Sequence, residues 1–214
     1  MVYLYPAIGL LGADIFGEFT IVFNKEAMMV TFVPSKYVQR SAFNGWRRIP
    51  LRKRISSHPD HGLHFAQTFL KGKKVPVLID TGSNLNIINW PLATLDENMD
   101  RIHRRLRGQQ LQGVIDTAQL RIETLFYDLV LGRHYWPEST VIVMDLDTLS
   151  SIAPVDKPIM IAGVGMFTPW TVAFDLGGDM IYVRANPDDP RPPTRARPTE
   201  QPRFALQSIG EGAS

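Results

Sequence analysis

Cysteine is absent from this chain of 214 residues, so disulfides and thiolate metal sites are excluded. Long apolar runs are absent too, because none reaches the roughly 18 residues that a membrane-spanning helix needs. Neither sign of charge is in large excess, since the formal net charge is only +2. We therefore expect neither a membrane nor a nucleic acid as a partner. Apolar residues make up 44% of the chain, which is enough for a substantial core.

Two familiar catalytic patterns are also missing. Ser139, Ser150 and Ser151 lie outside any G-x-S-x-G motif, so nothing favours a serine hydrolase. A glycine-rich phosphate loop is not present either, because "DLGGDM" has the pattern of a hairpin turn.

A group of three histidines, His58, His61 and His64, raises the question of a metal site. The three lie on a loop that contains proline and glycine, their spacing is not helical, and only Asp60 is near as a fourth ligand. We interpret the group as an ordinary loop and expect no metal and no cofactor.

Basic residues and prolines are unevenly distributed along the chain. Residues 27–59 contain no acidic residue but several lysines and arginines. We interpret 34–61 as a solvated basic linker, with contact to nucleic acid or a membrane surface as the alternative. Residues 186–214 hold six prolines between Pro187 and Pro202, a composition typical of a disordered tail.

Most of the remaining sequence has the pattern of short strands. "LHFAQTFL" and "VPVLID" flank Lys71-Gly72-Lys73 and predict a hairpin, and further strands are predicted at 86–90, 118–132 and 139–145. One helix is predicted over 91–108, beginning at Pro91 and ending at Gly108. The sequence thus predicts a mainly β protein with few helices.

An internal repeat relates the two ends of the chain. With an offset of 151 residues, 12–32 aligns with 163–183 without a gap, and the apolar pattern is kept. Each copy predicts a short helical step followed by two strands around a turn. The identical pairs are Gly12/Gly163, Phe16/Phe167, Thr20/Thr171, Phe23/Phe174 and Met29/Met180.

The stretch Asp80-Thr81-Gly82-Ser83 follows a run of apolar residues that predicts a buried strand. A carboxylate at such a place is costly unless donors compensate it. Gly82 lets the backbone turn so that N–H groups are directed at the carboxylate, Thr81 can donate to a neighbouring loop, and Ser83 can bond the outer oxygen. This pattern predicts either an acid held rigidly for catalysis or an inactive acid that caps a turn.

One such acid does little chemistry alone, but two that face each other share a proton. The charged member is then a base for a bound water, and the protonated member polarises a carbonyl. Such a pair hydrolyses amides by general acid–base catalysis, with neither a metal nor a covalent intermediate.

The stretch "VPVLIDTGSNLNII" resembles the active-site loop of aspartic proteases of the pepsin–retropepsin superfamily. "IMIAG" is similar to that family's second landmark, in which Ile161, Ala162 and Gly163 would lie beneath the loop. "GLLGADIF" at 9–16 resembles the same landmark in a preceding half. The chain thus resembles a two-half enzyme of the bacterial type that lacks most of its first half. Gly165 departs from the family, which usually has aspartate there.

The resemblance implies a closed retropepsin-like β-barrel with one or two short helices. It implies that 1–33 is the C-terminal remnant of a first half and that 62–185 is one full half. The family closes a flap over its substrate, and 109–122 is the candidate here, with Gly113, Val114 and Ile115 at its tip. The tyrosine that commonly serves in the flap is absent, so no catalytic role is assigned to it.

The function implied is that of an aspartic endopeptidase with a peptide or protein as its substrate. Asp80 needs a second aspartate, whose position by the repeat would fall before Met1. We expect it to come from a missing N-terminal half, and a homodimer through two Asp80 loops is the competing arrangement. The alternative function is a catalytically inactive module of the same fold that binds peptides or mediates an interaction.

Overall fold

The computed structural model describes residues 17–53, 63–70, 73–111, 122–145, 154, 156–185 and 204–206. Strands dominate over helices among them, which confirms the prediction of a mainly β protein. The strands are β1 (Phe19–Asn24), β2 (Met29–Pro34), β3 (Arg47–Pro50), β4 (Arg52–Lys53), β5 (His64–Leu70), β6 (Lys73–Asp80), β7 (Ile87–Ile88), β8 (Ile122–Leu131), β9 (His134–Val143), β10 (Met160–Gly163), β11 (Thr171–Asp175), β12 (Met180–Arg184) and β13 (Phe204–Leu206). The helices are α2 (Trp90–Ala93) and α3 (Glu97–Leu111), with 3-10 helices η1 (Ser35–Tyr37), η2 (Arg40–Phe43) and η5 (Val164–Met166).

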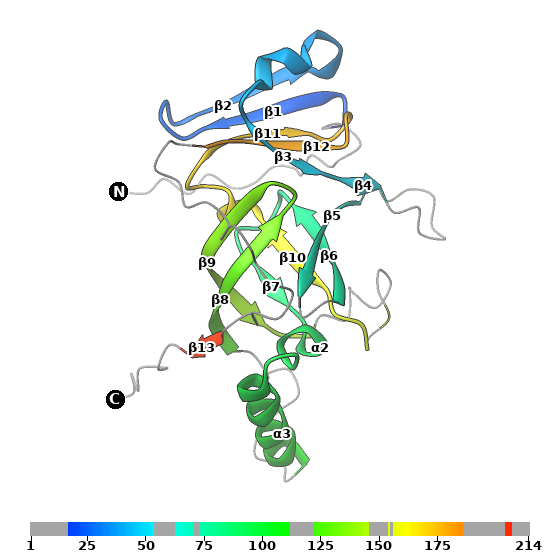
Figure 1. Cartoon of the computed structure of the whole chain (residues 1–214), viewed down its shortest axis with the longest axis vertical. Coiled ribbons are helices and arrows are strands. Elements are labelled where there is room, and N and C mark those ends of the chain that lie inside the picture. The colour runs from blue at the N-terminus through cyan, green and yellow to red at the C-terminus, as the bar shows by residue number, and fades with distance from the viewer. Residues whose placement is uncertain are drawn as a thin grey trace, which may run out of the picture.

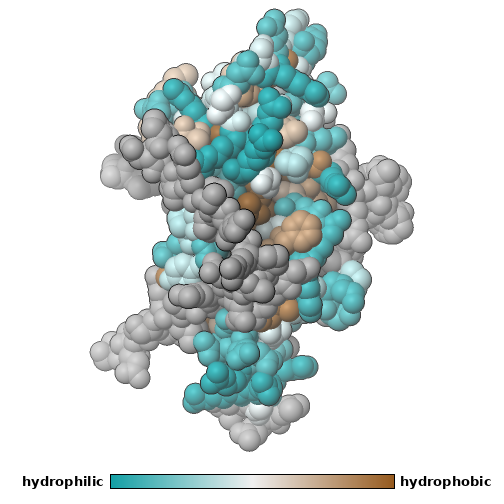
Figure 2. Space-filling model, in the orientation of Figure 1, coloured by the Kyte–Doolittle hydropathy of each residue, from teal (hydrophilic) through white to brown (hydrophobic). Residues whose placement is uncertain are grey.

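The strands form two sheets. One has five strands in the order β2-β1-β11-β12-β3, and the other has eight in the order β13-β8-β9-β7-β10-β6-β5-β4. In Figure 1 the five-stranded sheet lies above the eight-stranded sheet, and α3 extends from the opposite end of the molecule. The surface over α3 is almost wholly hydrophilic in Figure 2, as expected for a helix that projects into solvent. None of the described helices is long and apolar enough to cross a membrane.

The two hairpins predicted by the sequence repeat lie side by side in the five-stranded sheet. β1 and β11 pair antiparallel, with Val22 opposite Ala173. These two residues are also equivalent in the repeat, since they are 151 residues apart. When equivalent residues of two copies face each other, the copies are related by a two-fold axis. The hairpins β1–β2 and β11–β12 therefore have a pseudo-two-fold axis between Val22 and Ala173.

The turns of the two hairpins are built alike. Asn24 Oδ1 accepts a hydrogen bond from the N–H three residues further on, at 3.0 Å, and its equivalent Asp175 does the same at 3.1 Å. Met28 and its equivalent Asp179 both have a left-handed backbone, with φ of 51° and 53°. This shared turn chemistry shows that the sequence repeat is also a structural repeat.

The eight-stranded sheet places β10 between two strands that are consecutive in the sequence. β10 runs parallel to β6 and antiparallel to β7, and the loop 81–86 joins β6 to β7 past the end of β10. β5 also contacts β8, so the sheet curls. The pairings of the described strands leave β13 and β4 at the edges, so they do not by themselves complete the closed barrel that the resemblance implies.

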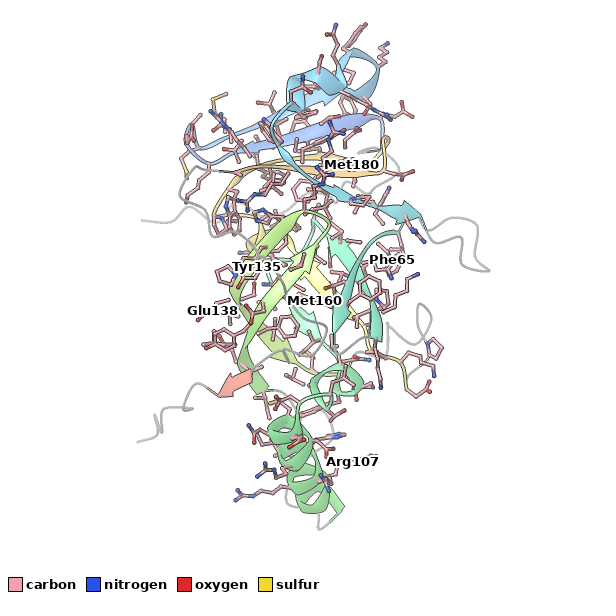
Figure 3. All side chains as sticks on the ribbon, viewed as in Figure 1. Phe65, Arg107, Tyr135, Glu138, Met160 and Met180 are labelled. Atoms are coloured by element: carbon pink, nitrogen blue, oxygen red, sulfur yellow. The ribbon has the colours of Figure 1, made fainter. Side chains whose placement is uncertain are left out.

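The main core is one buried cluster that includes residues of both sheets. Phe174, Ile181 and Val183 of the five-stranded sheet belong to the same buried cluster as Trp136 and Met160 of the eight-stranded sheet. Figure 3 shows Met160 in the middle of the lower sheet. Burying each such side chain contributes about 1.5–3 kcal/mol, so the two sheets stabilise each other.

The helical region differs from the prediction of one helix over 91–108. Asn89 caps α2, and Asp96 accepts hydrogen bonds from the first N–H groups of α3, so two short polar side chains start two separate helices. Gly108 does not end the second helix, which continues to Leu111. Nothing packs within 4 Å of a side chain at position 108, so the glycine is tolerated there.

Two segments expected outside the folded part contribute to the sheets. Within the predicted linker 34–61, β3 joins the five-stranded sheet, Ile49 is fully buried, and Phe43 stacks on Tyr182 at 4.2 Å between ring centres. Within the predicted tail, the described residues 204–206 form β13, which pairs with β8.

Candidate active site

Asp80 is the last residue of β6, at the point where this strand leaves the sheet. The strand is held there because Val75, Val77 and Ile79 are buried in the core. Asp80 itself is half-buried. Its Oδ1 accepts a hydrogen bond from the Gly82 N–H at 3.0 Å, and its carbonyl oxygen accepts one from the Ser83 N–H at 3.3 Å. The carboxylate is thus held by the turn that follows it.

The end of β10 lies directly against this turn. In the parallel register of β6 and β10, Gly163 is aligned with Asp80. The Val164 N–H donates to the Ser83 carbonyl oxygen at 2.7 Å, so η5 continues the contact beyond the strand. Ile161 and Ala162 are buried in the sheet below. The stretch Ile161–Gly163 therefore forms the floor on which the Asp80 turn lies.

The floor contains glycine because the loop above approaches it too closely for a side chain. A Cβ atom at Gly163 would lie 2.5 Å from the Leu85 carbonyl oxygen and 2.6 Å from that of Ser83. A Cβ atom at Gly165 would lie 2.4 Å from the Asn84 carbonyl oxygen. Position 165 departs from the resembled family, and this contact gives a physical reason, since the loop here leaves no room for aspartate.

Ser83 and Thr81 differ in how the structure uses them. Ser83 was expected to bond the outer oxygen of Asp80, but its hydroxyl accepts from the Leu85 N–H at 3.1 Å and lies 3.5 Å from the Leu85 carbonyl oxygen. The hydroxyl therefore shapes the loop rather than compensating the carboxylate. Thr81 is half-buried in the same turn.

Asn86 is a site residue that the sequence analysis missed. Its Oδ1 accepts from the Gly163 N–H at 3.1 Å, and its Nδ2 donates to the Thr140 carbonyl oxygen at 3.1 Å. One amide thus joins the Asp80 loop, the end of β10 and β9. Asparagine just before a short apolar pair is the only sequence signal, and it also fits an ordinary loop.

Several predicted residues lie outside the described part of the chain. The flap candidates Gly113, Val114 and Ile115 are among them, as are the landmark at 9–16 and two of the three histidines. The third, His64, is buried, and its Nε2 donates to the Leu176 carbonyl oxygen at 3.0 Å. That bond ties β5 to the five-stranded sheet.

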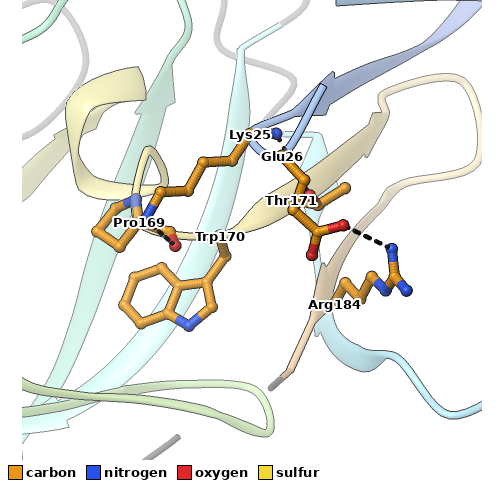
Figure 4. Close-up of a pocket in the computed structure, with 6 residues that line it drawn as sticks. All are labelled: Lys25, Glu26, Pro169, Trp170, Thr171 and Arg184. Atoms are coloured by element: carbon orange, nitrogen blue, oxygen red, sulfur yellow. Dashed lines mark hydrogen bonds and ion pairs between the residues drawn. The ribbon is translucent and has the colours of Figure 1, made fainter. Parts of the chain in front are cut away.

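A pocket between the two repeated hairpins is separate from the Asp80 loop (Figure 4). Lys25 Nζ donates to the Pro169 carbonyl oxygen at 3.1 Å, and Arg184 pairs with Glu26 at 3.6 Å. Every charged group in it is thus engaged with another residue of the pocket, and we assign it no catalytic role. The lining residues are Lys25, Glu26, Pro169, Trp170, Thr171 and Arg184.

Comparison with known proteins gives a remote likeness among solved structures. No family model and no curated protein matches the chain. Among solved structures, the chain is similar to the crystal structure of a retropepsin-like aspartic protease from Rickettsia conorii, with 14% sequence identity and a TM-score of 0.33. The match covers 65% of this chain and 90% of that chain. A likeness this remote does not assign the chain to a family.

Proposed function

We propose that the chain is one half of an aspartic endopeptidase, with Asp80 as its contribution to a catalytic pair. The observation that carries this proposal is the position of Asp80, half-buried at the end of β6 in a turn fixed against Gly163 of β10. Catalytic groups must be positioned by rigid elements. Here the turn follows β6 and lies against β10, and both strands belong to the core.

Asp80 acts in this proposal with a second aspartate from another half. One carboxylate takes a proton from a bound water, and the other, protonated, donates a hydrogen bond to the carbonyl oxygen of the peptide bond. The water oxygen then attacks the carbonyl carbon. The C–N bond breaks as the carboxyl group that took up the proton passes it to the leaving nitrogen. Gly82 contributes by donating its N–H to Asp80, which keeps that carboxyl group in one orientation.

The test is peptide-library cleavage between about pH 3 and 7 by the chain assembled with its second half. General acid–base catalysis contributes about 10²–10⁴-fold, so Asp80→Asn should lower the rate by at least about 100-fold. The matched control is Asp156→Asn. Asp156 is exposed and precedes the first residue of β10, whereas Asp80 is aligned with the last residue of that strand, so the two acids lie at opposite ends of β10.

Two results would count against the proposal. Cleavage that Asp80→Asn leaves unchanged would remove Asp80 from the reaction. Peptide binding without cleavage by the complete assembly would favour a non-catalytic module that keeps the fold.

A further inference from the structure

The pocket between the repeated hairpins has a counterpart within the same chain, because each of its lining residues has an equivalent 151 positions away. The strand register supports this equivalence, since Thr171 lies opposite Arg184 as Thr20 lies opposite Val33. The pseudo-two-fold axis therefore maps the pocket onto a second place in the five-stranded sheet. The equivalent pairs are Lys25/Leu176, Glu26/Gly177, Pro169/Glu18, Trp170/Phe19, Thr171/Thr20 and Arg184/Val33.

The counterpart is closed by packing. Leu176 is buried and belongs to the main core. A Cβ atom at Gly177 would lie 2.5 Å from the Gly17 carbonyl oxygen, so the space beside this turn is filled. Only Glu18 is charged in the counterpart, whereas three of the six residues that line the pocket are charged. One framework is thus closed in one copy, and open and charged in the other.

Trp170 gives the pocket a fixed apolar wall. Its indole ring packs edge-on against His134 and Trp136, with ring centres 4.4 and 5.8 Å apart. The ring is only half-buried, and it lines the pocket. Figure 4 shows it near Lys25, with Arg184 on the other side of the pocket. An apolar group of a ligand can therefore lie against the indole.

The two cations of the pocket keep donors that no residue of the pocket uses. Lys25 Nζ has three N–H groups, one of which bonds the Pro169 carbonyl oxygen. Arg184 has five, and its Nη1 lies 3.6 Å from Glu26 Oε2, which is beyond a normal hydrogen bond. Both members of this ion pair are more than half exposed, and such pairs contribute little to stability. An anion can therefore replace Glu26 beside Arg184 at little cost.

We propose that this pocket binds a small carboxylate whose neighbouring apolar group lies against Trp170. Arg184 binds the carboxylate through two parallel N–H···O bonds, and Lys25 adds a second positive charge. The C-terminal residue of a peptide and a free amino acid both carry this chemistry. With its open mouth the pocket has a volume of about 480 Å³, which admits one such residue. The pocket is separate from Asp80, so this proposal does not depend on the proposed function.

The experiment titrates the ¹⁵N-labelled full chain with N-acetylleucine, leucine and N-acetylleucinamide, and follows the indole N–H signals by NMR. Trp170→Phe assigns the signal of Trp170. We expect this signal to shift with N-acetylleucine until it saturates, and not to shift with the amide, which lacks the carboxylate. Trp90 of α2 does not line the pocket, so its signal is the internal control.

The two carboxylates distinguish the sources of the ligand. Tighter binding of N-acetylleucine than of leucine would support the proposal with a peptide C-terminus as the ligand. Tighter binding of leucine would support it with a free amino acid, whose ammonium group Glu26 can accept.

Charge substitutions test the roles of the pocket residues, with N-acetylleucine as the probe. Arg184→Gln should weaken binding at least about 10-fold, because the paired bonds to the carboxylate are lost. Glu26→Gln should tighten it by about 2–5-fold, because it removes the acid that competes for Arg184. Arg101→Gln, at an exposed position on α3, is the matched control and should leave binding unchanged.

Three results would overturn the proposal. They are the absence of a saturable shift with both carboxylates, an equal shift with the amide, and binding that Arg184→Gln leaves unchanged. The remaining NMR signals report whether each variant keeps its fold, so a loss of binding can be distinguished from a loss of structure.

Discussion

At the scale of single residues, Gly163 determines how closely the Asp80 turn approaches the sheet. Backbone oxygens of the loop occupy the space that a side chain at 163 would need, and backbone atoms cannot move as a flexible side chain can. The loop would have to lift away from β10 to admit even a methyl group. This residue therefore links the packing of the sheet to the position of the proposed catalytic acid.

We expect Gly163→Ala to lower the free energy of unfolding by about 1–3 kcal/mol, because overpacking forces the backbone to shift. Chemical denaturation of the purified chain measures the change. Gly108→Ala is the control, since nothing lies within 4 Å of that position in α3 and alanine favours a helix by about 0.5–1 kcal/mol. Equal effects of the two substitutions would show that the loop yields without cost.

Asn86 and Ser83 show at the same scale what the sequence could not reveal. The position of Asp80 followed from a buried strand and a glycine turn, which are local patterns. The partners of Asn86 come from β9 and β10, which lie more than 50 residues away in the chain. The hydroxyl of Ser83 could equally reach the carboxylate or its own loop, and only the fold selects Leu85.

At the scale of elements, the strands and the repeated hairpins were predictable and the pairing of distant strands was not. Alternating apolar residues predict where a strand runs, but they do not say that β10 inserts between β6 and β7. The helices were mispredicted for a local reason. Asp96 lies within an apolar pattern of helical spacing, yet its side chain bonds backbone N–H groups and starts a new helix.

The β8–β9 hairpin is held at an irregular point by a side-chain bond. Asp128 has a left-handed φ of 59° where its strand faces Pro137, which has no N–H to donate. The Tyr135 hydroxyl donates to Asp128 Oδ1 across the two strands. Burial, followed by this hydrogen bond and the negative charge of Asp128, raises the pKa of Tyr135 to about 12.

We expect the contribution of this bond to be present below about pH 10 and to be lost as the pH rises towards 12, because the folded state holds the phenol proton more tightly. Tyr135→Phe should cost about 1 kcal/mol at pH 7, and the difference from wild type should shrink by pH 11. Urea denaturation at both pH values measures it. Tyr127→Phe on the same hairpin serves as the control, since no described carboxylate accepts from its hydroxyl. A difference that stays constant with pH would contradict the assignment.

At the scale of the whole molecule, the hairpin β1–β2 occupies the place beside β11 that the hairpin β11–β12 of a second chain would take in a two-fold symmetric dimer. Removal of residues 1–34 would expose the edge of β11 and the side of Phe174 that Phe23 covers. Two shortened chains could then pair through β11, with Ala173 opposite Ala173 of the other chain, because the observed register places equivalent residues opposite each other.

We therefore expect the purified full chain to sediment as a monomer and the shortened chain to sediment as a dimer. The absence of cysteine allows a sharp check of the register. In the shortened chain, Ala173→Cys should form an intermolecular disulfide under mild oxidation, because directly opposed residues of an antiparallel pair lie within disulfide range. Val172→Cys should not, because that residue would face Phe174 of the other chain. A folded, monomeric shortened chain would show that the axis between Val22 and Ala173 does not govern assembly, whereas a dimer linked at 172 would show a shifted register.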